Sequence, residues 1–345
     1  MLHTIWIISL VLFFLSLAVM GGLLLLRWVR QRRELKDAAV RSELSRQMVI
    51  WRLQPDRATT QLKRATRRNP SQVADILIHA LELVQGDDQA RLVQLGQALG
   101  LDNFLLDQLT SSRPLQRLEA AEKLAFFHTR NVIQALSLSL KDSYPPLRLA
   151  AARALAGFDS DVPAHVLRDA AWGDSVLVDD LFETLANRQS QDLVELAQDE
   201  HVAVHRRVSA VNALAGTGGY ALLPVFSSLA EHNAPALRAA AAKALGLLGH
   251  PKAEPMLAKL LGDSEHQVRV AAAQAAGAIQ LVNLYERLVS MLDDEQWWVR
   301  LAAAEALAKG GQQGRKQLQA ACSADSENVR SMAQVVLLEY GEVNG

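Results

Sequence analysis

The chain has 345 residues, of which half are hydrophobic and 5% are aromatic, and its formal net charge at pH 7 is −1. This length and composition suffice for a large core or a long array of small ones, so the fold does not require disulfide or metal staples. The chain has a single cysteine, Cys322, which excludes an intramolecular disulfide and suits a reducing compartment. We expect Cys322 to be a small buried side chain.

The first predicted element is a transmembrane helix at residues 4–26. This run has no charged residue and about the 20 residues that a helix needs to cross a hydrocarbon core. Four arginines follow it between positions 27 and 33, which favours a cytoplasmic location for the rest of the chain. We therefore expect a single-pass protein of the cytoplasmic (inner) membrane, with its N-terminus outside. A cleaved signal peptide is disfavoured because no basic residue precedes the run.

The second predicted element, residues 27–69, is a basic juxtamembrane helical segment. Residues 27–68 carry 13 Lys and Arg against 4 Asp and Glu, whereas the remainder of the chain carries 23 against 33. Contact with anionic lipid explains this concentration of positive charge beside a membrane helix. Nucleic-acid binding through the same segment is the alternative interpretation.

A repeat dominates the remainder of the chain. The stretch "PALRAAAAKALGLLG", which begins at position 235, has counterparts that each contain an arginine followed by alanines. Successive arginines lie about 30 residues apart, with one divergent copy that has Val178 in the arginine position. The arginines are Arg117, Arg148, Arg207, Arg238, Arg269, Arg300 and Arg330. A period near 30 with two helices per unit predicts an α-solenoid, in which small side chains let neighbouring helices approach closely.

These motifs resemble HEAT repeats, specifically those of phycobilisome-lyase-type proteins, whose signature is similar to Val-Arg-x-x-Ala-Ala-x-Ala-Leu-Gly after an aspartate. The resemblance is good over residues 112–340 and weak over residues 70–110. It implies an all-α fold in which the transmembrane helix precedes an α-α superhelix of seven to eight repeats at residues 112–345. Residues 70–111 are then helical, with a degenerate first repeat as one interpretation.

The resemblance also implies a polar ladder between neighbouring units, formed by the aspartate of each turn and the arginine of the helix. The predicted members are Asp142, Arg148, Asp263, Arg269, Asp294, Arg300, Asp325 and Arg330. An aspartate at a helix start accepts backbone N–H groups, and a nearby arginine can bond it with two nitrogens. Arg207 and Arg238 have no aspartate at the expected offset, so the sequence predicts a weaker ladder there.

In HEAT proteins the second helices line the concave side, which implies a partner-binding column at the position five residues after each arginine. The column consists of Glu122, Arg153, Glu183, Asn212, Lys243, Gln274 and Glu305, with Val335 at its end. Its signs alternate, which favours a protein partner over nucleic acid. Trp297 and Trp298 are candidates for an aromatic anchor, and filling of the gap between two units is the other interpretation.

Chemistry-bearing motifs are scarce in the sequence. It contains no glycine-rich phosphate loop, paired-cysteine metal motif or nucleophile elbow. His201 and His205 have the i, i+4 spacing of a metal pair but no convincing third ligand. We therefore predict no catalytic residue, no metal and no cofactor.

These observations together predict a membrane-anchored, non-enzymatic scaffold that presents a cytoplasmic solenoid to a membrane-associated protein partner. By resemblance to anchored HEAT proteins, the partner would belong to an envelope glycan-synthase or secretion assembly. A lyase-like or cofactor-handling HEAT protein is an alternative, and nucleic-acid binding through residues 27–68 is another.

Overall fold

The computed structural model describes residues 20, 42 and 55–342. In residues 55–342 the regular structure consists of α-helices and short 3₁₀ turns. The chain divides into two compact units, and the boundary along the chain falls between Ala135 and Leu136, inside one helix.

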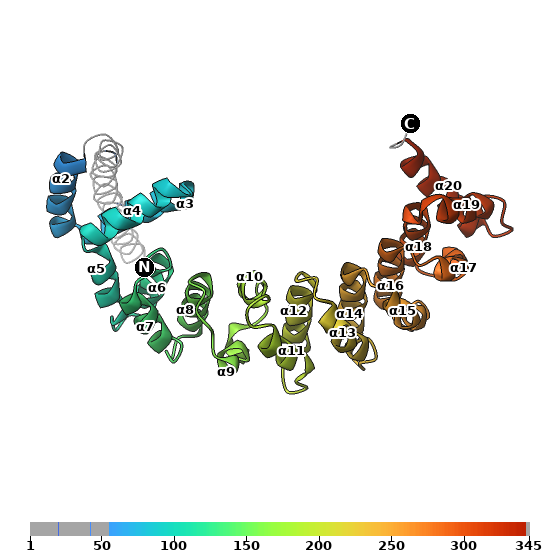
Figure 1. Cartoon of the computed structure of the whole chain (residues 1–345), viewed down its shortest axis with the longest axis horizontal. Coiled ribbons are helices and arrows are strands. Elements are labelled where there is room, and N and C mark those ends of the chain that lie inside the picture. The colour runs from blue at the N-terminus through green and yellow to red at the C-terminus, as the bar shows by residue number, and fades with distance from the viewer. Residues whose placement is uncertain (1–19, 21–41, 43–54, 343–345) are drawn as a thin grey trace, which may run out of the picture. The chain divides into compact units, whose positions relative to one another are not determined.

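In the first unit the helices of residues 55–124 pack in chain order, each against the next (Figure 1). Its helices are α2 (Pro55–Arg68), α3 (Pro70–Leu83), α4 (Asp87–Ala98), α5 (Leu101–Leu109), α6 (Pro114–Leu124) and the start of α7 (Arg130–Ser139). Leucines and Phe127 lie in the core of this unit, and the missing side chain of Gly96 leaves room for the Phe127 ring. A Cβ atom added at Gly96 would come within 2.7 Å of both that ring and Leu77.

The second unit is built from helix pairs arranged in two rows (Figure 1). One row, on the inner side of the bend of this unit, contains α8 (Pro145–Gly157), α10 (Val176–Leu185), α12 (Val204–Ala215), α14 (Pro235–Leu248), α16 (His266–Ile279) and α18 (Trp297–Lys309). The outer row contains α9 (Ala164–Leu167), α11 (Ser190–Gln198), α13 (Leu223–Leu229), α15 (Glu254–Leu260), α17 (Tyr285–Ser290) and α19 (Gly311–Ala321), and α20 (Glu327–Glu342) packs against α18 and α19. Short 3₁₀ turns lie between the rows, namely η1 (Ala170–Trp172), η2 (Tyr220–Leu222), η3 (Pro251–Ala253), η4 (Val282–Leu284) and η5 (Met291–Asp293).

Close packing of the inner row depends on alanine and glycine. A Cβ atom added at Gly246 in α14 would lie 2.8 Å from the Cβ of Ala275 in α16. One added at Gly277 in α16 would lie 2.6 Å from the Cα of Ala306 in α18. Both distances are far below a normal carbon contact, so these helices approach as closely as their backbones permit. This is the physical reason why the repeat is rich in alanine.

The inner helices begin and end with local sequence signals. Proline occupies the first turn of α8 and α14, where its missing N–H is no loss. Gly249 ends α14 in the left-handed region with φ 64°, and Gln280 adopts the same conformation after α16 with φ 60°. The chain can then reverse within a few residues into the next outer helix.

The expected location of the protein is contradicted by the structure. Among the described residues, no helix is both long enough and apolar enough to cross a membrane. The longest helix in residues 55–342 is α20, which has 16 residues, fewer than the about 20 that a bilayer core requires. We therefore withdraw the single-pass placement in the inner membrane. The run at residues 4–26, apart from Met20, and most of the basic segment lie outside the described residues.

Candidate functional site

Six residues of the predicted polar column lie on the inner row of the second unit, and Glu122 lies on α6 of the first unit. Glu122, Glu183, Asn212, Lys243 and Gln274 are exposed, and Arg153 and Glu305 are half-buried. In α12, α14, α16 and α18 the residues on both sides of the column position are buried and apolar, mostly alanine. In these four helices the column side chain therefore stands between buried apolar residues.

Part of the column is neutralised by neighbours. Arg153 Nη2 lies 2.7 Å from Asp180 Oδ2 of the next inner helix, and both side chains are exposed enough for water to compete. Glu305 lies 3.6 Å from Lys309 one turn later in α18. Within the described chain, the side chain of Lys243 has no hydrogen bond or ion pair. Lys243 is therefore the cation of this column most available to a partner.

Trp297 and Trp298 form an exposed aromatic pair at the start of α18. Their rings are perpendicular, with centroids 4.6 Å apart, and the two residues are 47% and 62% exposed. More than two fifths of each tryptophan faces solvent, so the two side chains do not fill the gap between neighbouring repeats. Trp298 lies seven residues before Glu305 on the same helix, which places both on one face.

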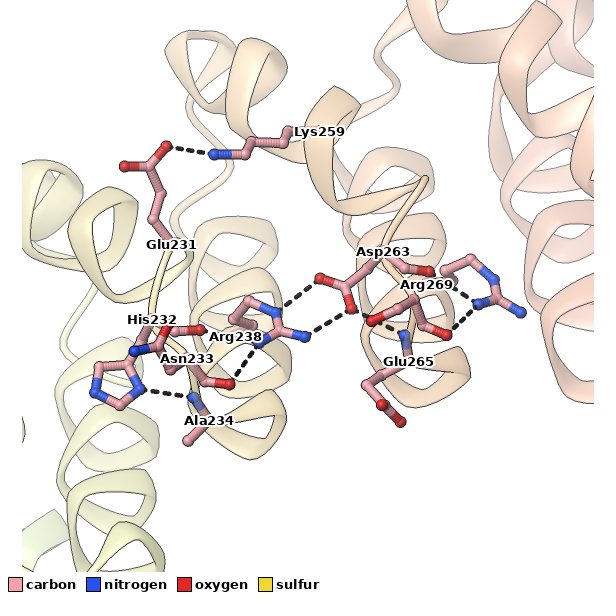
Figure 2. Close-up of polar contacts among 10 residues, drawn as sticks. Glu231, His232, Asn233, Ala234, Arg238, Lys259, Asp263, Glu265 and Arg269 are labelled. Atoms are coloured by element: carbon pink, nitrogen blue, oxygen red, sulfur yellow. Dashed lines mark hydrogen bonds and ion pairs between the residues drawn. The ribbon is translucent and has the colours of Figure 1, made fainter.

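The arginine ladder links consecutive repeats through carboxylates. Arg238 on α14 donates from Nε and Nη2 to the two oxygens of Asp263, at 2.7 and 2.8 Å. Arg269 on α16 donates in the same way to Asp294, with both distances 2.9 Å. Figure 2 shows the Arg238 fork facing the Asp263 carboxylate, with Asp263 in the turn that leads to α16. Two parallel charge-assisted bonds fix both the distance and the orientation of adjacent repeats.

The pairing differs from the one predicted. Arg238 and Arg269 each bond the carboxylate of the following repeat, 25 residues later, and Arg269 does not bond the carboxylate of the aspartate six residues earlier. The earlier aspartate provides its backbone carbonyl, as Asp263 does for Arg269 Nη1 at 2.9 Å. Arg238, for which the sequence predicted a weak ladder, forms one of the two fully bidentate rungs because its acceptor lies downstream.

The remaining predicted ladder residues follow the same rule with variations. Arg148 bonds the carbonyl of Asp142 at 2.8 Å and the carboxylate of Asp169 at 2.5 Å. Arg300 bonds the carbonyls of Asp294 and Glu295. Arg330 bonds the carbonyls of Ala324 and Asp325, and the Asp325 carboxylate has no ion pair among the described residues. The arginine at the end of the array therefore closes its own turn only.

The ladder changes the protonation of its members. The two bonds from Arg238 are the main cause that lowers the pKa of Asp263, and its partial burial opposes them. The same bonds raise the pKa of Arg238. Burial alone would raise the pKa of Asp294. Hydrogen bonds from Arg269 and the Gln296 amide, together with the arginine charges, outweigh burial and lower this pKa. These carboxylates are therefore structural anions and not proton donors at neutral pH.

The divergent repeat uses a residue that sequence reasoning missed. Arg206 is 2% exposed, and it donates to the carbonyls of Asp169 and Gly173 at 2.9 Å each. Its guanidinium carbon lies 5.7 Å from the centroid of the Trp172 ring. The doublet of Arg206 with Arg207 was the only available signal, because the other inner helices have an apolar residue or glutamine in that position.

The histidine pair does not form a metal site in the described residues. His201 is exposed in the turn before α12 and its Nδ1 lies 3.2 Å from Asp199 Oδ1, while His205 is exposed in the first turn of α12. Among residues 55–342, no group of three or more His, Cys, Asp or Glu side chains is arranged to hold a metal ion.

The comparisons with known proteins identify the repeat. Family models described as HEAT repeats match residues 190–277 and 284–309. They do not distinguish the phycobilisome-lyase type. No curated protein sequence matches the chain.

Two solved structures resemble this one in fold. They are Kap121p bound to Pho4p, with a TM-score of 0.50 and 12% identity, and the karyopherin Kap121p bound to the extreme C-terminus of the protein phosphatase Cdc14p, with a TM-score of 0.50 and 13% identity. The matches cover 83% and 88% of this chain but 40% and 42% of the two structures. This chain thus spans about two fifths of their length, and identities this low show the fold alone. The chain carries HEAT repeats within an all-α helical solenoid.

Proposed function

We propose that this protein is a non-enzymatic scaffold that binds a partner protein on the inner row of its second unit. One observation carries the proposal, namely the column of polar side chains on the inner row, whose sequence neighbours are buried and apolar in α12, α14, α16 and α18. The spacing of such a column is set by the solenoid, so a partner with matching periodicity can contact several repeats at once.

The shape of this fold supports a protein partner. A helical solenoid buries its small side chains in helix contacts and leaves an extended face without a deep pocket as its binding surface. The two Kap121p structures are complexes with Pho4p and with the extreme C-terminus of Cdc14p, so proteins of similar fold bind protein partners in those cases. The charge of the second unit argues in the same direction, because it carries 18 Lys and Arg against 25 Asp and Glu. A phosphate backbone would be repelled by this balance.

Trp297 and Trp298 complete the proposed surface. Tryptophan is enriched among the residues that contribute most to protein interfaces, and a pair this exposed is costly to leave in water without a partner. An envelope assembly as the partner depended on the predicted membrane anchor, so it is not part of this proposal.

A charge-reversal experiment tests the binding face. First, a photo-crosslinking residue at Gln274 would identify the partner, and mass spectrometry would map the crosslink. The double variant Arg153→Glu and Lys243→Glu should then weaken binding of that purified partner by about tenfold or more, because a favourable contact becomes repulsive. Its melting temperature should stay within a few degrees of wild type, since Lys243 is exposed and the ion pair of the half-buried Arg153 with Asp180 is open to water. Trp298→Ala should also weaken binding.

The matched control is Lys259→Glu on α15 of the outer row, whose side chain is 64% exposed and pairs with Glu231. This variant should bind the partner as wild type does. Equal binding by the inner-row double variant and wild type would refute the proposed face. A metal or chromophore bound at about one per chain in the purified protein would instead support the cofactor-handling alternative.

A further inference from the structure

His232 occupies a ladder position that is an aspartate in the regular repeats. The two bidentate rungs join residues 25 positions apart, Arg238 to Asp263 and Arg269 to Asp294. Twenty-five residues after Arg207 the sequence has His232. The rung between the repeat of α12 and the repeat of α14 therefore has an imidazole where the next two rungs have a carboxylate.

The imidazole reproduces one function of that carboxylate. His232 Nδ1 accepts the backbone N–H of Ala234 at 2.9 Å, as Asp263 Oδ1 accepts that of Glu265 at 2.9 Å. Figure 2 shows these two equivalent bonds in successive turns. Because the partner is a backbone donor, Nδ1 must carry no proton, so this bond exists only with a neutral imidazole.

The imidazole cannot reproduce the other function, which is to neutralise the arginine. Arg207 is 3% exposed, and its guanidinium makes one hydrogen bond in the described chain, from Nε to the carbonyl of Ala197 at 2.8 Å. No carboxylate within the described residues forms an ion pair with it. A buried guanidinium without a bonded anion is costly.

The charged groups around His232 come from three places. Arg207 lies on α12, Arg238 on α14, and Glu200 in the turn before α12. The pKa of His232 is lowered mainly by partial burial, and further by the two arginines, while Glu200 acts in the opposite direction. Positive charge thus dominates around the imidazole.

We propose that His232 makes the joint between α12 and α14 a pH-sensitive weak point of the solenoid, which loosens when the imidazole becomes protonated. Protonation removes the acceptor of the Ala234 N–H group and adds a third positive charge beside Arg207 and Arg238. The joints at Arg238 and Arg269 keep their carboxylates over the same pH range. Acidification therefore opens one particular joint, where the curvature of the second unit can change.

The sign of the effect follows from the depressed pKa. The unfolded chain, with an ordinary histidine pKa of 6.5, binds the proton more readily than the closed joint does. The stabilising contribution is complete above pH 6.5 and is lost as the pH falls through 6.5 toward the pKa of the closed joint. The population of the open joint should rise by about tenfold for each unit by which the pKa is depressed.

Hydrogen exchange at pH 7.5 and pH 5.5, corrected for intrinsic rates, measures this opening in the full-length chain. Amides of residues 223–238 should lose protection at the lower pH, while those of α16 and α18 should not. His232→Asn retains an uncharged acceptor and should remove the pH dependence of residues 223–238. His232→Asp should build the missing rung with Arg207 and raise protection at both pH values.

His250 provides the matched control. Its Nδ1 accepts the N–H of Lys252 at 3.1 Å in an exposed turn, so His250→Asn should leave the pH dependence of residues 223–238 as in wild type. NMR titration of the wild-type imidazole gives a second measurement that does not depend on any variant. A His232 pKa at or above 6.5, or equal pH dependence in wild type and His232→Asn, would overturn the proposal.

Discussion

Arg238 and Arg269 each stabilise two structures at once. One nitrogen closes the turn that precedes its own helix, and the other two hold the carboxylate of the next repeat. Arg269 does this with the carbonyls of Asp263 and Ser264 and with both oxygens of Asp294. The side chains of this rung are only 15% and 13% exposed, so water cannot replace a lost partner easily. Exposed pairs such as Arg153 with Asp180 lack this property.

Arg269→Ala should therefore lower the free energy of unfolding by about 1–3 kcal/mol, because it leaves a partly buried carboxylate without its donors. Urea unfolding followed by circular dichroism measures the change. Arg153→Ala, which breaks an exposed ion pair, is the comparison and should cost about 1 kcal/mol or less. Equal effects of the two substitutions would show that the buried rung contributes no more than a surface pair.

At the scale of the helix, the distance between neighbours is set by residues without bulky side chains. In α16, buried alanines face both adjacent inner helices, and Gly277 lies against the backbone of Ala306. A longer side chain here must separate two helices whose loops also carry ladder rungs. The helices and the ladder therefore depend on each other geometrically.

Gly277→Ala tests this packing, because two effects of the substitution oppose each other. Replacing glycine in a helix gains about 1 kcal/mol of helix propensity, but overpacking at a tight contact costs about 1–3 kcal/mol. We expect net destabilisation and a lower melting temperature. Gly157→Ala at the end of α8 meets no atom within 4 Å and should be neutral or slightly stabilising. A more stable Gly277→Ala variant would mean that α16 and α18 can separate without cost.

At the scale of the whole molecule, contacts are made between neighbouring repeats. In the second unit, α12 packs against α14, α14 against α16 and α16 against α18. Stability in such an array is a sum of local terms, so damage at one joint should remain near that joint. This locality is what allows a single histidine to weaken one joint selectively.

Loss of the Arg238 rung should accordingly be visible only nearby. In Arg238→Ala, amide protection should fall in α12, α14 and α16, whereas α8 and α10 should keep wild-type protection. Hydrogen exchange with peptide-level mass spectrometry measures both regions in one experiment. Uniform loss of protection across the second unit would show that it unfolds as one cooperative body.

The candidate site was only partly predictable from sequence. The column could be read from the repeat because it needs only a period and the exposure of one position per helix. The acceptors of the ladder could not, since the carboxylate that Arg269 bonds lies 25 residues later in the next repeat, whereas the aspartate nearer in sequence, six residues earlier, offers only its carbonyl. The roles of Arg206 and His232 were not predicted for a related reason. They depend on the position of each residue relative to the preceding repeat, which no local sequence pattern specifies.

The sequence by itself determined the repeat, its helices and its small-residue faces, because propensity and periodicity are local properties of the chain. Only the tertiary structure decided which carboxylate meets which arginine, where a rung is missing, and that Trp297 and Trp298 remain exposed. These features depend on how one repeat is placed on the next. That placement follows from helix contacts of a few ångströms, which residue spacing alone does not specify.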